Sequence, residues 1–155
     1  GYRCVATASA RNAGLLKELG AGEVLDHARP TIVEDVVEAL RGRRLAGSLH
    51  ATGSMDDCFA VVARCAGSRR VAATLAPPEE RPVGVEATHI FGSSLKDDEV
   101  GPMIYRDFLP QALASGAFVP APPANVLGHG LEMLQPALEA LKAGVSAAKI
   151  VVILP

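Results

Sequence analysis

Hydrogen-bonding side chains without a carboxylate occupy residues 9–12, where Ser9, Arg11 and Asn12 stand close together. An arginine can bind two phosphate oxygens at once, and a hydroxyl and an amide add neutral hydrogen bonds. These residue types favour phosphate binding, and in a dinucleotide fold such a turn accommodates a 2′-phosphate, where an acid would hold the ribose hydroxyls. The alternative is that Ser9 only caps a helix and Arg11 is solvated, and the pattern leaves both interpretations open.

Small residues form a second candidate turn at Thr52-Gly53-Ser54. They would let a flat adenine ring or a ribose approach the backbone, although taken alone the turn is better explained as a helix cap. No histidine has a Ser, Cys or Asp at a spacing typical of a nucleophile and its base. We therefore interpret all four as structural or surface groups: His27, His50, His89 and His129. A basic cluster of Arg41, Arg43 and Arg44 at a helix end is interpreted as a solvated face.

The composition describes a chain that can bury a core, because 49% of its 155 residues are hydrophobic and 21% are charged, with a formal net charge of −2. These values exclude a disordered tail and a polyanion-binding arm. With 4% aromatic residues and no Trp, we expect no nucleic-acid partner. No run reaches the ~18 apolar residues of a membrane helix and no signal-peptide layout opens the chain, so we expect no membrane association and a cytoplasmic protein. Three scattered cysteines predict neither a disulfide framework nor a metal site.

Strand and helix patterns alternate through the first half of the chain. Each short β-favouring segment is followed by a turn and by an apolar stripe at helical spacing. We expect strands at 2–7, 23–26, 45–50 and 70–75, a first helix ending at Gly20, a second opened by a capping box of Thr31 and Glu34, and a third with Ser54 as its N-cap. This alternation predicts an α/β fold with a parallel sheet, so ligand-binding residues are expected in the turns after the strands.

The pattern changes after residue 75. A proline-rich loop at 76–82 precedes extended structure at 83–91 and a helix over much of 100–114, interrupted or started at Pro102 and Pro110. A loop at 121–124 and a helix with Pro136 in its first turn lead to the apolar run 149–154, expected to be a strand buried on both faces. No Gly-x-Gly-x-x-Gly turn occurs, so we expect the piece that would bind a pyrophosphate to lie outside this chain. Because residue 1 is Gly rather than Met, we expect an excerpt or a truncated product.

Three stretches resemble medium-chain dehydrogenases/reductases, the superfamily that includes the zinc-type alcohol dehydrogenases. Residues 1–12, which read Gly-Tyr-Arg-Cys-Val-Ala-Thr-Ala-Ser-x-x-Asn, and residues 19–26 are similar to the second βαβ unit of that family, and residues 140–152 are similar to its end. The Ala-Thr-Ala-Ser-x-x-Asn motif together with Ile90-Phe91-Gly92 most resembles fungal trans-acting enoyl reductases and toxin-cluster oxidoreductases, which use NADPH and lack zinc.

The resemblance implies a cofactor-binding role for residues in several turns. Ser9, Arg11 and Asn12 match the turn that holds the 2′-phosphate of NADPH, and His27 stands where many relatives place a Tyr against that phosphate. The other matching positions are Thr52 and Gly53 near the adenosine, Thr74 and Leu75 near the nicotinamide ribose, and Ile90, Phe91 and Gly92 beside the nicotinamide. No catalytic residue and no metal ligand is assigned, because the family's groups that polarise the substrate lie in an amino-terminal half that we expect to be absent.

The implied fold is α/β, a Rossmann-like doubly wound and mostly parallel sheet that lacks its first strand and glycine-rich turn, with a carboxyl-terminal helix and strand. Residues 1–155 are expected to form a partial NAD(P)-binding domain with the carboxyl-terminal return segment of a medium-chain reductase. The missing strand would lie at the centre of the sheet, so its two neighbours would each have an unpaired edge.

The implied activity is the transfer of hydride from NADPH to the β-carbon of an α,β-unsaturated ketone or acyl thioester by the full-length enzyme, with the isolated chain inactive. The implied partners are a small-molecule or carrier-bound acyl substrate and a polyketide synthase, and the oligomeric state is left open. Two alternatives remain: a non-catalytic remnant or interaction module of the same fold, and part of a zinc-dependent alcohol dehydrogenase.

Overall fold

The computed structural model describes all 155 residues, which divide into two compact units, Gly1–Pro102 and Met103–Pro155. The first unit is built from parallel strands connected by helices. Its strands are β1 (Val5–Ala8), β2 (Glu23–Asp26), β3 (Ser48–His50), β4 (Arg70–Ala73) and β5 (Glu86–His89). Its main helices are α1 (Ala13–Glu18), α2 (Ile32–Ala39) and α3 (Met55–Arg64), and short 3₁₀ turns lie at Ala10–Asn12 and Ser94–Asp97.

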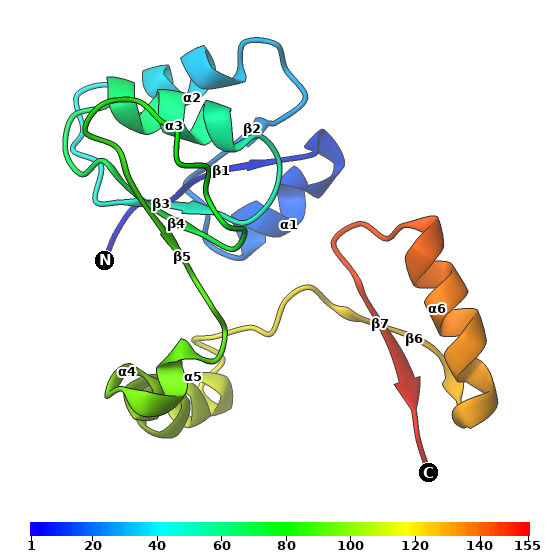
Figure 1. Cartoon of the computed structure of the whole chain (residues 1–155). Helices are drawn as coiled ribbons and strands as arrows, with labels where there is room; N and C mark the ends of the chain where they lie inside the picture. The colour runs from blue at the N-terminus through cyan, green and yellow to red at the C-terminus, as the bar shows by residue number, and fades with distance from the viewer. The chain divides into compact units, whose positions relative to one another are not determined.

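The strands of the first unit form two parallel sheets, one with β1 beside β2 and one with the order β3-β4-β5. Helices α2 and α3 lie on one face of the strands and α1 lies on the other (Figure 1). Parallel strands need crossover connections, and helices placed on both faces are the usual solution. The prediction of a doubly wound α/β fold with parallel strands is therefore confirmed.

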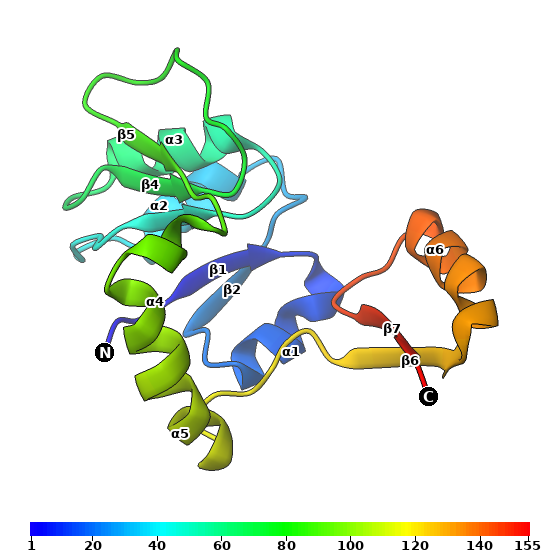
Figure 2. The ribbon, with the colours of Figure 1, turned by 60° about the horizontal axis from the view of Figure 1, so that its bottom comes forward.

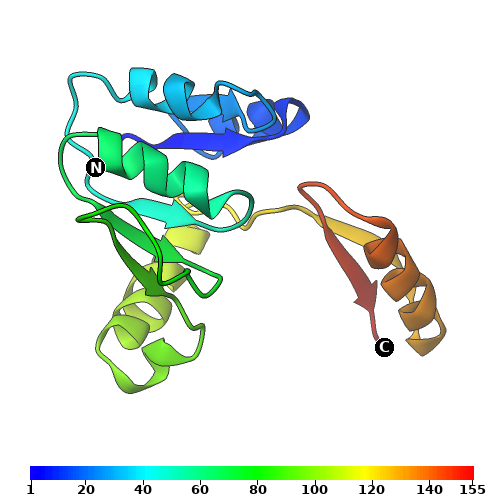
Figure 3. The same cartoon turned by 45° about the horizontal axis from the view of Figure 1, so that its top comes forward.

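Strands β1 and β3 each have a single hydrogen-bonded neighbour. Figure 3 shows the two strands pointing the same way with α2 and α3 along one face. These helices pack against each other, and an ion pair of 3.0 Å joins Glu34 Oε1 of α2 to Arg64 Nη1 of α3. The helix layer thus holds the two sheets in one unit while their facing strands do not pair. As expected, β1 and β3 each have one edge without a hydrogen-bonded strand.

The core of the first unit lies between α3 and the sheet of β3, β4 and β5. Phe59 and Val62 of α3 are 1% and 0% exposed, and they cluster with the buried Val71 of β4 and with Val85. Residues of β4 alternate, so that Val71 and Ala73 are buried while Arg70 is exposed. Burial of side chains of this size stabilises the fold by roughly 1.5–3 kcal/mol each. The apolar stripe of α3 is what attaches the helix to the sheet.

The two predicted helix caps have different outcomes. Ser54 caps α3 as predicted, since its Oγ accepts a hydrogen bond of 3.1 Å from the Asp57 N–H. The capping box of Thr31 and Glu34 is wrong, because the Thr31 side chain makes no cap hydrogen bond and its hydroxyl instead donates to the Asp35 carboxylate. The carboxylate of Glu34 instead accepts a hydrogen bond of 3.0 Å from the guanidinium of Arg64.

The helix expected over 100–114 is present and is interrupted, as predicted. Its parts are α4 (Val100–Pro102), a π-helix (Met103–Phe108) and α5 (Leu109–Ala114), in which Pro110 lies at the start. A proline lacks the N–H of an α-helical hydrogen bond and clashes with the preceding turn. Two prolines eight residues apart therefore bracket the part of the helix that departs from α geometry.

The second unit contains a βαβ unit of β6 (Ala124–His129), α6 (Leu134–Ala143) and β7 (Lys149–Ile153), with β6 and β7 paired in parallel (Figure 2). Pro136 lies in the first turn of α6, as predicted. Strand β6 was not predicted, because its residues include Ala, Asn and Gly, which have low strand propensity. The prediction that the 149–154 run is buried on both faces is wrong: Ile153 and Leu154 are 42% and 53% exposed, and β7 has β6 as its sole paired neighbour.

No helix of the structure combines the length and the apolar character needed to cross a membrane.

Candidate functional site

The turns after β3, β4 and β5 are joined by short hydrogen bonds at the carboxyl ends of these strands. The Thr74 N–H donates to the His50 carbonyl at 3.0 Å, and the Thr74 hydroxyl donates to the Ala51 carbonyl at 2.7 Å. The Ile90 N–H donates to the Ala73 carbonyl at 2.7 Å. Thr74 therefore connects the turn after β4 to the turn after β3, which carries Thr52 and Gly53. The Ile90 bond connects the turn after β5 to the end of β4.

The turns after β1 and β2 are also brought together. Ser9 directly follows β1 and His27 directly follows β2, and the parallel register places Ala8 opposite Asp26. As a result, Ser9 Oγ lies 3.1 Å from His27 Nε2, and the His27 N–H donates to the Ala8 carbonyl at 3.1 Å. The structure thus connects two predicted residues that lie 18 positions apart in the sequence.

Three charged residues lie close to Ser9 or His27 in the sequence: Arg11, Asp26 and Arg29. Arg11 lies exposed on the 3₁₀ turn that follows Ser9, and residues 9–12 contain no carboxylate. Asp26 is the acid at the end of β2, and its Oδ1 accepts a hydrogen bond of 3.1 Å from the Ala28 N–H. Arg29 is paired with Asp35 at 3.1 Å. The turn after β1 therefore carries a hydroxyl, an amide and a guanidinium, of which the Arg11 guanidinium belongs to an exposed residue.

His50 is a buried polar residue at the end of β3, and it is 4% exposed. Its Nε2 lies 3.2 Å from the Gly53 carbonyl, so the imidazole supports the turn of Thr52 and Gly53, while its buried Nδ1 has no hydrogen-bond partner. Sequence reasoning assigned His50 a structural or surface role and did not connect it with Gly53. The available signal was a histidine at the last position of a strand, three residues before a glycine.

The remaining predicted residues present an open surface at the same strand ends. Gly53 has a φ of +91°, and a Cβ at Gly53 or at Gly92 would meet nothing within 4 Å. Leu75 and Phe91 are 58% and 65% exposed, and the Phe91 ring packs edge-on against His89. Ser9, Arg11, Asn12 and His27 lie at the end of the β1–β2 sheet, whereas the other predicted residues lie at the end of the β3–β4–β5 sheet.

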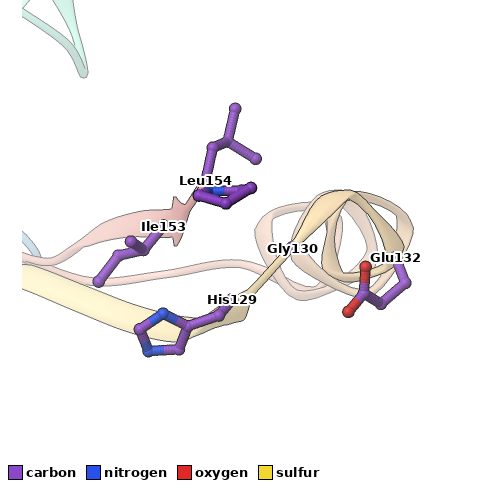
Figure 4. A pocket seen from close by; sticks show the side chains of 6 residues that line it. His129, Gly130, Glu132, Ile153 and Leu154 are labelled. Carbon is purple, nitrogen blue, oxygen red and sulfur yellow. The ribbon is translucent and has the colours of Figure 1, made fainter.

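A shallow pocket in the second unit contains none of the predicted residues. It has a volume of ≈ 360 Å³ and lies where β6 and β7 end. Figure 4 shows its polar side chains, His129 and Glu132, on either side of Gly130, with Ile153 and Leu154 as apolar neighbours. No group of three or more His, Cys, Asp or Glu side chains in the structure is arranged to hold a metal ion.

Parallel strands with helices on both faces, and a cluster of polar turns at the strand ends, define the class of doubly wound nucleotide-binding folds. Two solved structures share this fold. The CurF ER cyclopropanase from the curacin A biosynthetic pathway matches with a TM-score of 0.67 and 19% identity, and the CurK enoyl reductase with 0.69 and 16%. Each match covers 96% of this chain and 46% of the other. At these identities the similarity shows the fold alone.

No protein-family model matches the chain. Fungal proteins match it over nearly all its length: the dehydrogenase azaJ of Aspergillus niger is 43% identical, the zinc-binding alcohol dehydrogenase domain-containing protein cipB of Emericella nidulans 40%, and the trans-enoyl reductase himH of Aspergillus japonicus 32%. These matches cover 100%, 98% and 98% of this chain, but 47%, 49% and 45% of the relatives, so the chain spans about half of their length. The chain is a homologue of these dehydrogenases and trans-enoyl reductases, and the resemblance to medium-chain dehydrogenases/reductases is confirmed.

Proposed function

We propose that this chain is the cofactor-binding part of an NADPH-dependent reductase that transfers hydride to an α,β-unsaturated ketone or acyl thioester. The proposal rests on the homology to fungal dehydrogenases and trans-enoyl reductases. Its main structural support is the hydrogen bond of 3.1 Å between Ser9 and His27, which joins two turns that the family resemblance assigns to the 2′-phosphate. A carrier-bound acyl substrate and a polyketide synthase partner belong to the same proposal.

The residues at the strand ends fit a phosphorylated dinucleotide. Ser9, Arg11 and Asn12 would hold the 2′-phosphate, because a guanidinium and neutral donors favour a dianion and residues 9–12 contain no carboxylate. His27 would be positioned there by Ser9. Gly53 has no side chain, so a flat adenine ring could lie against its backbone. A side chain at this position would project into the open surface.

The reactive chemistry in this proposal is the hydride transfer that a reduced nicotinamide supplies when bound. The chain's own residues bind and orient. Thr74 and His50 fix the turns that carry Leu75, Thr52 and Gly53 through the hydrogen bonds described above. Ile90, Phe91 and Gly92 would lie beside the nicotinamide and shield one side of it from water. No residue of the chain is assigned to polarise the substrate or to donate a proton.

The activity is tested with the full-length gene product. NADPH and an enone or enoyl thioester are mixed with the protein, and consumption of NADPH is followed by its absorbance, with parallel titration of NADPH binding. We expect oxidation of NADPH that depends on the unsaturated substrate. Binding without oxidation would contradict the reductase activity, and absence of binding would contradict the cofactor assignment.

Charge reversal at Arg11 is expected to separate the two nicotinamide cofactors. If Arg11 contacts a 2′-phosphate, Arg11→Glu removes a charge-assisted contact and should weaken NADPH binding by about 1–3 kcal/mol, with a much smaller effect on NADH. Dissociation constants for both cofactors, measured on the full-length gene product, check this. Arg69→Glu, a reversal at the exposed residue before β4, is the matched control and should change neither. Equal weakening of both cofactors by Arg11→Glu would defeat the assignment.

A second candidate is an interaction module, because β1 and β3 each leave one edge unpaired. Exposed strand edges recruit further strands from a partner or from another copy. In this case the purified 155-residue chain should self-associate, with a mass that rises with concentration in sedimentation or light scattering. A monomer that persists at high concentration would argue against this second function.

A further inference from the structure

A pocket lined by arginines lies at the opposite end of the strands in the first unit. It has a volume of ≈ 450 Å³ and is formed where α2 and α3 end, by segments that lead into β3 and β4. Its lining includes Arg41, Arg43, Arg44 and Arg64, with Val37 and Leu40 as an apolar wall, and we call it the basic pocket. The predicted cofactor turns follow the strands, whereas the basic pocket precedes them. The two sites therefore lie at opposite ends of the parallel strands.

The basic pocket carries a surplus of positive charge. Arg41 is paired with Glu38, and Arg64 is paired with Glu34 at 3.0 Å. The hydrogen bond from Arg64 lowers the pKa of the Glu34 carboxyl. Arg43 and Arg44 are exposed, and neither forms an ion pair in the structure, which leaves two unmatched guanidinium groups.

The carboxyl ends of α2 and α3 offset only part of this surplus. Each helix end carries about half a unit of negative charge. Two such ends amount to about one unit, against two unmatched guanidinium groups. A net positive field therefore remains in the basic pocket, and an anion with more than one charge would complement it.

Backbone hydrogen bonds join the two segments that line the basic pocket. The Leu45 N–H donates to the Ala66 carbonyl at 2.8 Å, and the Ser68 N–H donates to the Leu45 carbonyl at 2.7 Å. These bonds form a parallel bridge between Leu45 and Gly67. Arg44 directly precedes this bridge on one segment, and Ala66 precedes it on the other. The two walls of the pocket are thus held together, which lowers the ordering cost of binding.

We propose that the basic pocket binds a small phosphate-bearing ligand. Guanidinium groups bind phosphate oxygens in pairs, and a phosphate or pyrophosphate carries the two or more charges that the unmatched Arg43 and Arg44 require. The wall of Val37 and Leu40 lets a nonpolar part of the ligand lie next to its phosphate. The proposal concerns a site separate from the proposed cofactor turns and does not depend on them.

The test uses the 155-residue chain and inorganic pyrophosphate, with binding measured by calorimetry. Arg43→Gln combined with Arg44→Gln removes the two unmatched charges and leaves the two ion pairs intact. We expect saturable binding that this variant weakens at least about tenfold. Arg81→Gln combined with Lys96→Gln makes the same change of charge elsewhere, and it should leave the affinity within about twofold of the parent.

Cys65 provides a second measurement, because it lines the basic pocket. Burial raises the pKa of the Cys65 thiol, whereas Cys4 is exposed and serves as the internal reference. Pyrophosphate should slow alkylation of Cys65 but not of Cys4, over the same concentrations that give the calorimetric signal. In the Arg43→Gln, Arg44→Gln variant this protection should be lost.

Several results would overturn the proposal. Absence of saturable pyrophosphate binding, or equal binding by the parent and the Arg43→Gln, Arg44→Gln variant, would exclude the site. Binding of citrate as tight as that of pyrophosphate would show a general anion surface instead of phosphate recognition. Binding of a short Asp/Glu peptide without binding of pyrophosphate would assign the pocket to an acidic protein partner.

Discussion

Replacement of Phe59 by alanine is expected to lower the free energy of unfolding of the first unit by about 3–5 kcal/mol. The Phe59 ring is 1% exposed and is the largest side chain in the cluster with Val62, Val71 and Val85. Its removal forfeits the transfer free energy of the ring and leaves a cavity between α3 and β4 that the short strands around it can only partly close. Urea unfolding followed by circular dichroism measures the effect, and the midpoint should fall at an unchanged slope.

Phe91→Ala is the matched control for this measurement. It removes the same atoms from the same unit, but the Phe91 ring is 65% exposed and contacts the His89 ring at its edge. The cost should stay within about 1 kcal/mol, as for a typical surface position. Comparable losses in the two variants would show that the α3–β4 cluster is not the core of the first unit.

Local sequence signals predicted most elements of the first unit. The strand expected at 23–26 coincides with β2, and Ser54 caps α3 because an N-cap needs only its own helix. The wrong or missing predictions concern residues whose partners lie far away in the sequence. Glu34 binds Arg64, 30 positions away, and so does not complete the capping box. Strand β6 has weak propensity and is formed by pairing with β7, which a single segment does not encode.

The candidate site was predictable in location but not in contacts. Alternating strands and helices place Ser9, Thr52 and Thr74 in turns at strand ends, and the structure agrees. The bond between Ser9 and His27 depends on the register that sets Ala8 opposite Asp26, and that pairing joins two segments which the sequence analysis considered separately. The link from His50 to Gly53 was missed for a different reason: it depends on the burial of an imidazole, which follows from packing. The roles of these residues in binding remain predictions.

Replacement of Gly67 by alanine is the second substitution with a large expected cost. Gly67 has a φ of +110°, in the region that L side chains rarely adopt, and a Cβ there would collide with the carbonyl oxygen of Leu45 and lie 2.6 Å from the Leu45 nitrogen. Both obstacles are backbone atoms, so rotation of a side chain cannot relieve the contact. The bridge between Leu45 and Gly67 would have to open, and it supports the segments that enter β3 and β4.

Gly20→Ala separates the two causes of this cost. Gly20 has a similar φ of +99°, but nothing lies within 4 Å of a Cβ built on it. Gly20→Ala should therefore cost only the backbone strain, about 1–2 kcal/mol, and Gly67→Ala should exceed it by at least about 1 kcal/mol in urea unfolding. Gly67→Ala should also weaken pyrophosphate binding at the basic pocket, because the walls are no longer fastened, whereas Gly20→Ala should not. Equal costs for the two variants would mean that the close approach of Leu45 to Gly67 does not hold these segments together.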